Sequence, residues 1–309
     1  MKEEIDAAAR SAIAKRPVLE EMLNAFATFF TEKAQLVEEL KPETMDAGFA
    51  PSAEPVKQGI PMCAEVSFDP LAPALNRAFA SLLSVIRTSF PAMDQEISWL
   101  KTAWKSKSPD LSILAKSRLA GDPKPLEACS HCLGVTAGIL DFALGMAVST
   151  VLESLEPALA EKIRAISWKG GFCPICGSLP CVSYLSKEDL GSEYLKGGGG
   201  KKFLHCSVCG HQWRIKRNLC PACGTDDKDH LIYFNVEEDS SERVDICRRC
   251  AMYLPCIDLR TIDFEPHMGM AAAGMVHLDA YAQQRGYTPM VWTPWNRLED
   301  GRKEIPQTQ

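Results

Sequence analysis

The chain has 309 residues and a formal net charge of −6, and 46% of its residues are hydrophobic and 24% charged. These values are ordinary for a globular protein of one or two domains and exclude a disordered chain, a collagen or a membrane protein with many spans. The acidic balance argues against a surface built to coat nucleic acid. The unusual feature is a count of 13 cysteines.

The N-terminal half, residues 1–168, is predicted to be helical. Apolar residues from Leu19 to Leu40 recur at spacings of three and four, which is the helical period, and Pro42 is expected to end this helix. Residues 42–62, rich in proline and glycine, are expected to form a loop. Further helices are predicted over 69–90, 91–104 and 110–119.

One stretch of this half, from Leu133 to Leu152, is apolar and about long enough to span a bilayer. It carries Asp141 near its centre, and a carboxylate in the middle of a membrane is costly. We therefore predict a buried core helix. The wider apolar region, 126–166, is expected to form two helices with a break near Pro157.

The composition changes near Trp168, after which short β-like runs alternate with glycines and cysteines as far as residue 265. The four glycines at 197–200 are expected to form a hairpin tip. A last helix is predicted over 268–285, ended by Gly286. The clearest strand predictions are 181–185, 213–215, 231–234 and 243–246.

Ten of the thirteen cysteines lie in five pairs of the form C-x-x-C. The N-terminus, Met1 to Asp6, is acidic and lacks the apolar core of a signal peptide, so a reducing, cytoplasmic compartment is expected. Thiol pairs in such a compartment are typical of metal or redox sites rather than of structural disulfides.

Four of these pairs predict two metal sites with four thiolates each. A C-x-x-C turn directs both sulfurs to one side, and a second turn completes a tetrahedron. Glycine follows three of the four turns and permits the close approach of backbone amides to sulfur. Pairing in sequence order is favoured over crossed pairing, which stays open. The expected ligands are Cys173, Cys176, Cys206 and Cys209 in one site, and Cys220, Cys223, Cys247 and Cys250 in the other.

The spacing does not choose between zinc and iron, because tetrahedral sulfur suits both metals. Zinc would be structural, whereas iron could also change its redox state. Basic residues between 196 and 217 can offset thiolate charge, or else contact a protein partner or phosphate. Region 169–265 has 13 basic and 14 acidic residues, which favours charge compensation or a protein partner over nucleic acid.

The fifth pair, Cys129 and Cys132, has no second pair nearby in the sequence. We predict buried thiols there, with a third metal or redox site left open. Cys181 and Cys256 lie in strand-like runs and are assigned to packing, and Cys63, in the expected loop, is assigned no role.

No catalytic site is expected. The chain has no phosphate-binding loop, dinucleotide-binding, zinc-protease or serine-hydrolase motif. Four thiolates also leave no open metal position for hydrolysis. His205 and His211, beside the expected ligands, are predicted to have surface or supporting roles, and His267 is assigned to packing.

The order of these motifs resembles that of the formate dehydrogenase accessory proteins, the FdhE family. The resemblance rests on the two outer cysteine turns, on the region between them and on the last predicted helix. It covers roughly residues 168–290, whereas the N-terminal half agrees only in being helical. The matching segments are 171–180, 202–224, 247–254 and 278–287.

The resemblance implies a multidomain α+β protein. Its parts would be a helical domain at 1–168, two rubredoxin-like or zinc-ribbon metal modules at 169–218 and 219–266, and a C-terminal helix and tail at 267–309. It also implies a non-catalytic cytoplasmic factor that holds iron or zinc in two sites and binds the catalytic subunit of formate dehydrogenase during its maturation. A homo-oligomer stays open, and neither nucleic-acid binding nor membrane insertion is expected. The alternatives are a rubredoxin-like iron redox carrier and a nucleic-acid-binding zinc ribbon.

Overall fold

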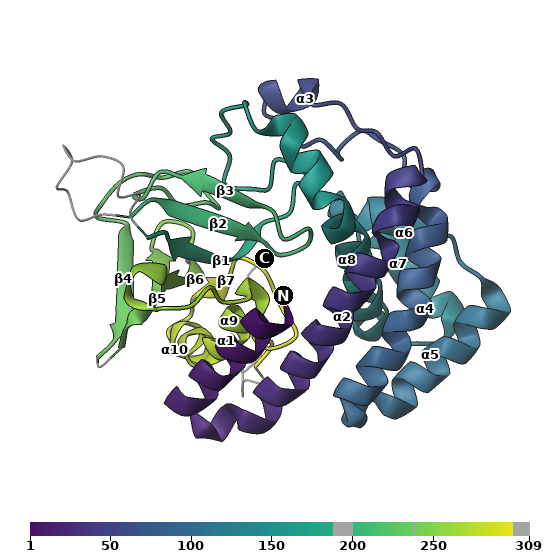
Figure 1. Ribbon diagram of the computed structural model, residues 1–309, viewed down its shortest axis with the longest axis horizontal. Coiled ribbons are helices and arrows are strands. Elements are labelled where there is room, and N and C mark those ends of the chain that lie inside the picture. The colour runs from purple at the N-terminus through teal and green to yellow at the C-terminus, as the bar shows by residue number, and fades with distance from the viewer. Residues whose placement is uncertain (188–199, 238, 299–309) are drawn as a thin grey trace, which may run out of the picture.

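The computed structural model describes residues 1–187, 200–237 and 239–298. Helices from the first half of the chain form one side of the molecule, and a curved sheet with two short helices forms the other (Figure 1). The predicted α+β architecture is confirmed. The domain boundaries remain a prediction.

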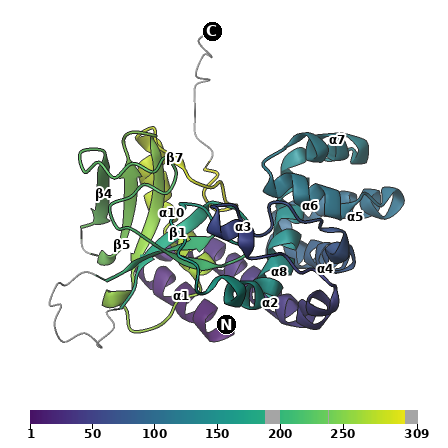
Figure 2. The same cartoon turned by 90° about the horizontal axis from the view of Figure 1, so that it is seen from above.

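The helical side is organised around two long helices, α2 (Glu20–Asp46) and α8 (Ala137–Ile163), which pack against each other and against α4 (Ala72–Ser89). Most of their apolar side chains are buried, as the helical period of the sequence requires. Figure 2 shows α4 to α7 grouped on the side of the molecule opposite the strands. The remaining helices are α1 (Lys2–Lys15), α3 (Glu54–Lys57), α5 (Asp94–Lys107), α6 (Leu111–Leu119) and α7 (Lys124–Leu133).

Two prolines do not end their helices, contrary to the prediction. α2 continues through Pro42, and α8 continues through Pro157. Each proline lies within the last two turns of its helix, so the lost backbone hydrogen bond disturbs few residues. The break in the apolar region falls instead at Gly134, between α7 and α8, where φ is +69°. This left-handed conformation is one that glycine adopts readily at the end of a helix.

By length and composition, α8 is the one described helix that could cross a membrane, and 67% of its most apolar window is buried inside the protein. Asp141 lies on its partly exposed side, where its Oδ1 is 2.8 Å from Nε of Arg118 on α6. The burial and this ion pair support the prediction of a core helix.

Seven strands form one mixed sheet in the order β3-β2-β1-β6-β5-β4, with β7 beside β6. The four predicted strands form, and β2, β6 and β7 are additional. The central strands β1 and β6 run parallel, with Ser183 opposite Cys256. The strands of the two predicted metal modules are therefore joined in a single sheet. The strands are β1 (Pro180–Leu185), β2 (Lys202–Cys206), β3 (Gln212–Ile215), β4 (Leu231–Val236), β5 (Asp239–Cys247), β6 (Met252–Asp258) and β7 (Thr288–Pro289).

The last predicted helix is split in two at Met275, into α9 (Met268–Gly274) and α10 (Val276–Gln284). A Cβ on Gly274 would lie 2.8 Å from Cβ of Ala12, so this glycine lets α9 pack closely against α1. α9 also packs against α2 and thus joins the sheet to the helical side. Of the predicted hairpin tip at 197–200, only Gly200 lies within the described residues.

Candidate metal centres

The structure brings the eight predicted ligands together in two sets of four, in sequence order. Within each set, all four Sγ atoms lie within 4.8 Å of one another. We call Cys173, Cys176, Cys206 and Cys209 the first cysteine group, and Cys220, Cys223, Cys247 and Cys250 the second cysteine group. All eight thiols are free, so neither group is a disulfide cluster.

The sulfur separations suit a tetrahedral ion. In the first cysteine group, Sγ atoms are 3.5 Å apart between Cys173 and Cys209 and 3.3 Å apart between Cys176 and Cys206. In the second cysteine group both corresponding separations are 3.7 Å. A metal with bonds of about 2.3 Å to four sulfurs sets their spacing at about 3.8 Å. The second group fits such an ion almost unchanged, and the first needs to open by a few tenths of an ångström.

The local chain geometry explains why glycine follows these turns. In the first turn, the backbone N–H of Gly177 donates to the carbonyl oxygen of Cys173 at 2.9 Å, which closes the loop around the sulfur. The residue that ends each of the four turns has a positive φ, namely Gly177 at +83°, Gly210 at +70°, Gly224 at +70° and Ala251 at +56°. The fourth turn thus holds an alanine in a conformation that costs an L-residue free energy.

The first cysteine group is buried, so four thiolates there would need a cation to balance their charge. Each of its four cysteines is at most 4% exposed. Burial raises the pKa values of the Cys173 and Cys209 thiols well above the usual value for cysteine. Neutral thiols are therefore favoured at these positions in the absence of a cation, and a bound metal would stabilise the thiolates that ligate it.

The second cysteine group lies closer to solvent. Cys220 and Cys247 are buried, but Cys223 is exposed and Cys250 is half-buried. Burial again raises the pKa of the Cys220 thiol. The same ligand pattern therefore occurs once in the core and once at the surface.

Hydrogen bonds from the helical half hold the first cysteine group on two sides, and the sequence did not reveal them. The hydroxyl of Ser149 on α8 donates to the carbonyl oxygen of Val208 at 2.7 Å, and the N–H of Val208 lies 3.4 Å from Sγ of Cys206. On the other side, the N–H of Cys63 donates to the carbonyl oxygen of Ile175 at 2.9 Å. A lone cysteine in a loop and a serine in an apolar helix carry no sequence signal for these contacts.

The remaining cysteines and histidines stand apart from these groups. Among the described residues, Cys129 and Cys132 join no metal-like cluster. The prediction that both are buried is wrong, because Cys132 is exposed near the end of α7 and Cys129 is only half-buried. His211 has a supporting role, because its Nδ1 lies 2.7 Å from Oε1 of Glu156 on α8. His205 lines a pocket between the helices and the sheet.

Comparison with known proteins supports the resemblance seen in the motifs. No family model matches the chain. The curated "Protein FdhE homolog" of Aquifex aeolicus is 32% identical over 153 residues, which are 48% of this chain and 51% of that protein. The homolog of Actinobacillus pleuropneumoniae serotype 3 is 30% identical over 118 residues, which are 37% of this chain and 34% of that protein. The chain thus aligns with between about a third and about half of the length of these relatives.

The fold comparison covers more of the chain. The crystal structure of the FdhE protein from Pseudomonas aeruginosa matches with a TM-score of 0.60 and 18% identity, over 94% of each chain. At this identity the likeness concerns the fold alone. The resemblance predicted from the cysteine motifs is confirmed: the chain is similar to FdhE proteins in sequence over about half of its length and in fold over nearly all of it.

Proposed function

We propose that this chain is a non-catalytic accessory factor that assists the maturation of formate dehydrogenase. The observation that carries the proposal is the pair of four-thiol groups within one sheet, in a chain similar to FdhE proteins. Four sulfurs around one ion leave no coordination position open, so the chemistry of these groups favours a structural or electron-transfer role over hydrolysis.

The metal sites would shape a docking surface. We propose that each cysteine group holds one ion of zinc or iron. An ion in the first group would tie β2 and its following turn to the turn that precedes β1, and an ion in the second group would tie β5 to the loop before β4. Such cross-links stabilise a folded state in which the sheet presents a fixed surface.

We propose that this surface binds the catalytic subunit of formate dehydrogenase in the cytoplasm, with neither membrane insertion nor nucleic acid involved. The test is deletion of the gene in its native host, with formate dehydrogenase activity and the amount of enzyme protein both measured. We expect activity to fall while transcription of the enzyme genes is unchanged. Full activity in the deletion strain would refute the proposal.

Complementation sharpens this test. The wild-type gene should restore activity, whereas Cys173→Ser and Cys223→Ser should restore less, and Cys132→Ser should match the wild type because Cys132 is an exposed thiol outside both groups. Affinity purification of the tagged wild-type protein should recover the catalytic subunit. Its absence under mild conditions would contradict direct binding.

One observation favours a second function, a rubredoxin-like iron redox carrier. The exposed Cys223 would bring an iron ion in the second cysteine group close to the surface, where electrons can pass to a partner. Metal analysis and voltammetry of protein purified from its native host decide between the two functions. Iron with a reversible one-electron couple would support the carrier, and tightly held zinc would exclude it.

A further inference from the structure

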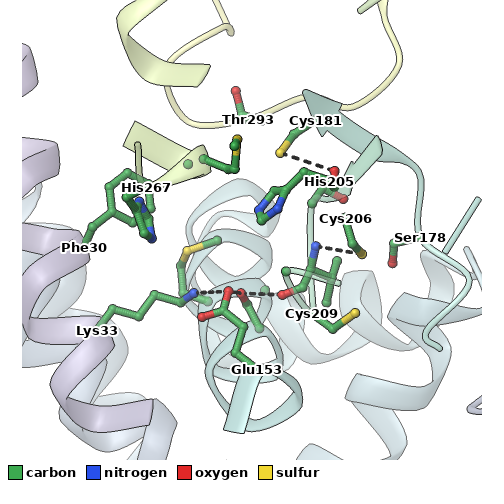
Figure 3. Close-up of a pocket in the computed structure, with 18 of the residues that line it drawn as sticks. Phe30, Lys33, Glu153, Ser178, Cys181, His205, Cys206, Cys209, His267 and Thr293 are labelled. Carbon is green, nitrogen blue, oxygen red and sulfur yellow. Dashed lines mark hydrogen bonds and ion pairs between the residues drawn. The ribbon is translucent and has the colours of Figure 1, made fainter. Parts of the chain in front are cut away.

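A pocket of about 610 Å³ lies between the helical side and the sheet (Figure 3). α2 and α8 line one side, and the turn that holds Cys206 and Cys209 lines another. Pockets of this size at the junction of two parts of a protein are typical binding sites for small molecules or single side chains. None of the functions proposed above uses this pocket.

One wall of the pocket is aromatic. The ring of Trp295 lies edge-on to Phe26 and Phe30, with centroid distances of 5.5 and 6.2 Å. Trp292 also lines the pocket and remains 39% exposed. This wall offers an apolar or aromatic group a large contact area.

The helix that carries Phe26 and Phe30 also brings a buried ammonium group to the pocket. Lys33 on α2 is 6% exposed, and its Nζ lies 2.6 Å from Oε1 of Glu153 on α8. The same carboxylate oxygen lies 3.0 Å from the hydroxyl oxygen of Ser149. An ammonium group has three N–H donors, and Glu153 is the one partner recorded for Lys33 within the described residues. Two of the three donors are therefore free to meet a ligand.

A histidine adds a donor of fixed orientation. Nδ1 of His267 accepts the backbone N–H of Met270 at 3.2 Å, so the proton of the neutral ring must be on Nε2. Burial and the charge of Lys33 lower the pKa of His267 to about 3, which keeps the ring neutral at pH 7. Figure 3 shows the rings of His267 and His205 pointing into the pocket from opposite sides, above Lys33 and Glu153. Nδ1 of His205 has no partner among the described residues.

We propose that this pocket binds a carboxylate carried on an apolar or aromatic group. The two other N–H groups of Lys33 and the Nε2–H of His267 can be donated to a ligand, and a carboxylate offers about four acceptor positions. A hydrogen bond between an ammonium and a carboxylate is among the strongest in proteins. The aromatic wall then receives the rest of the ligand. Two sources share this chemistry, a free organic acid and the terminal carboxylate of a polypeptide.

The test uses the full-length, metal-loaded protein. The probes are 3-phenylpropionate and a tetrapeptide that ends in phenylalanine with a free carboxylate, each compared with its amide. Binding is measured by calorimetry and by the fluorescence of the tryptophans in the pocket. We expect the acid to bind at least about tenfold more tightly than its amide. Tighter binding of 3-phenylpropionate than of the peptide identifies a free acid as the ligand, and the reverse order identifies a chain terminus.

Three outcomes would overturn the proposal: no binding of either acid, equal binding of acid and amide, or tighter binding of phenethylamine than of the acids. The last result would mean that Glu153, not Lys33, governs the pocket. None of these outcomes bears on the accessory function, because that proposal rests on the cysteine groups.

Substitutions locate the binding site. His267→Asn removes the Nε2 donor but keeps a side-chain acceptor at the start of α9, where asparagine is favoured. It should weaken binding of the acid about tenfold or more without changing the melting temperature. His131→Asn, at an exposed position on α7, is the matched control and should leave binding unchanged.

The double variant Lys33→Met with Glu153→Gln removes both charges together, so no carboxylate is left buried alone. It should abolish the preference for acid over amide. If this variant does not fold, as judged by circular dichroism, His267→Asn decides the question. Unchanged acid binding in His267→Asn would then place the ligand elsewhere.

Discussion

The two cysteine groups share one ligand pattern and differ in their surroundings. The four cysteines of the first group are at most 4% exposed and belong to the main hydrophobic core, together with Ile175 and Leu204. In the second group Cys223 is exposed and Cys250 is half-buried. The motif therefore sets which atoms meet, and the rest of the chain sets how well solvent reaches them.

The helical half accounts for the difference. Ser149 of α8 and the loop that contains Cys63 contact the first group from two directions. The second group is supported by the sheet and by the segment after α10, where the N–H of Thr288 donates to the carbonyl oxygen of Ala251 at 2.9 Å. The segment just before the first group also touches a turn of the second, because a Cβ on Gly171 would fall 1.9 Å from the carbonyl oxygen of Pro221. We infer that the first group is a structural centre and the second an exchangeable one.

Removing one ligand from each group gives the largest expected effects. Cys173→Ser should lower the free energy of unfolding by more than about 4 kcal/mol, because it disrupts a metal site inside the core. Cys223→Ser should lose its metal while the helical side stays folded. Circular dichroism and metal content measure both effects, with Cys132→Ser as the control. Similar stability losses in the two variants would contradict the division into a structural and an exchangeable centre.

A chelator should remove the metal ions of the two cysteine groups at different rates. A chelator reaches the second group through the exposed Cys223, but reaches the first only after local opening of the core. We therefore expect two release phases of one ion each, followed with a colorimetric metal indicator. The fast phase should disappear in Cys223→Ser. A single phase that releases both ions would refute this assignment.

Local sequence signals predicted the composition of the two cysteine groups well. A C-x-x-C turn positions its two sulfurs through neighbouring residues alone, and the runs before Cys247 and after Cys181 have the composition of strands. The resemblance to FdhE came from the same local motifs. Nothing in the spacing indicated that β1 and β6 would pair in parallel, because that pairing joins residues more than 70 positions apart, such as Ser183 and Cys256.

Features that depend on tertiary packing were missed. Pro42 and Pro157 remain inside helices because the packed faces of α2 and α8 outweigh the loss of single hydrogen bonds. Ser149 was hidden in a helix that the sequence marked only as apolar. The orientation of His267 depends on its contact with the N–H of Met270, in a short helix whose packing against α1 no local pattern predicts.

The contact between β6 and α10, beside the second cysteine group, should make the stability of the protein depend on pH. The hydroxyl of Tyr253 on β6 donates to Oδ1 of Asp279 on α10 at 2.8 Å, and burial raises the pKa of Asp279 to about 7. An unfolded aspartate titrates near pH 3.9. The folded state therefore binds the proton more tightly, and the stabilising contribution present below about pH 4 is lost as the pH rises to about 7.

Titration of Asp279 should lower the free energy of unfolding by on the order of 1.4 kcal/mol for each pH unit between about pH 4 and pH 7. Denaturant unfolding measured from pH 4.5 to pH 7.5 should show it in the wild type and not in Asp279→Asn. Asn296→Asp is not a suitable control, since it adds a charge to the same network, whereas the exposed Asp122→Asn is suitable. A slope that survives in Asp279→Asn would assign the pH dependence to other groups.

The smallest expected effects come from the residues that end the cysteine turns, and they test whether the two groups tolerate change equally. Gly224→Ala, in the second group, places a Cβ in open space, so backbone strain at φ +70° is its only penalty, about 1 kcal/mol. Gly177→Ala, in the first group, adds a close contact of 3.2 Å with Cγ of Pro61 and should cost more. Ala251→Gly relieves strain at φ +56° but makes the unfolded chain more flexible, so a gain of about 0.5 kcal/mol is expected. Denaturant midpoints of the metal-loaded proteins give all three values. If Gly177→Ala cost no more than Gly224→Ala, the loop around Pro61 would yield easily, and the tight enclosure assigned to the first group would not hold.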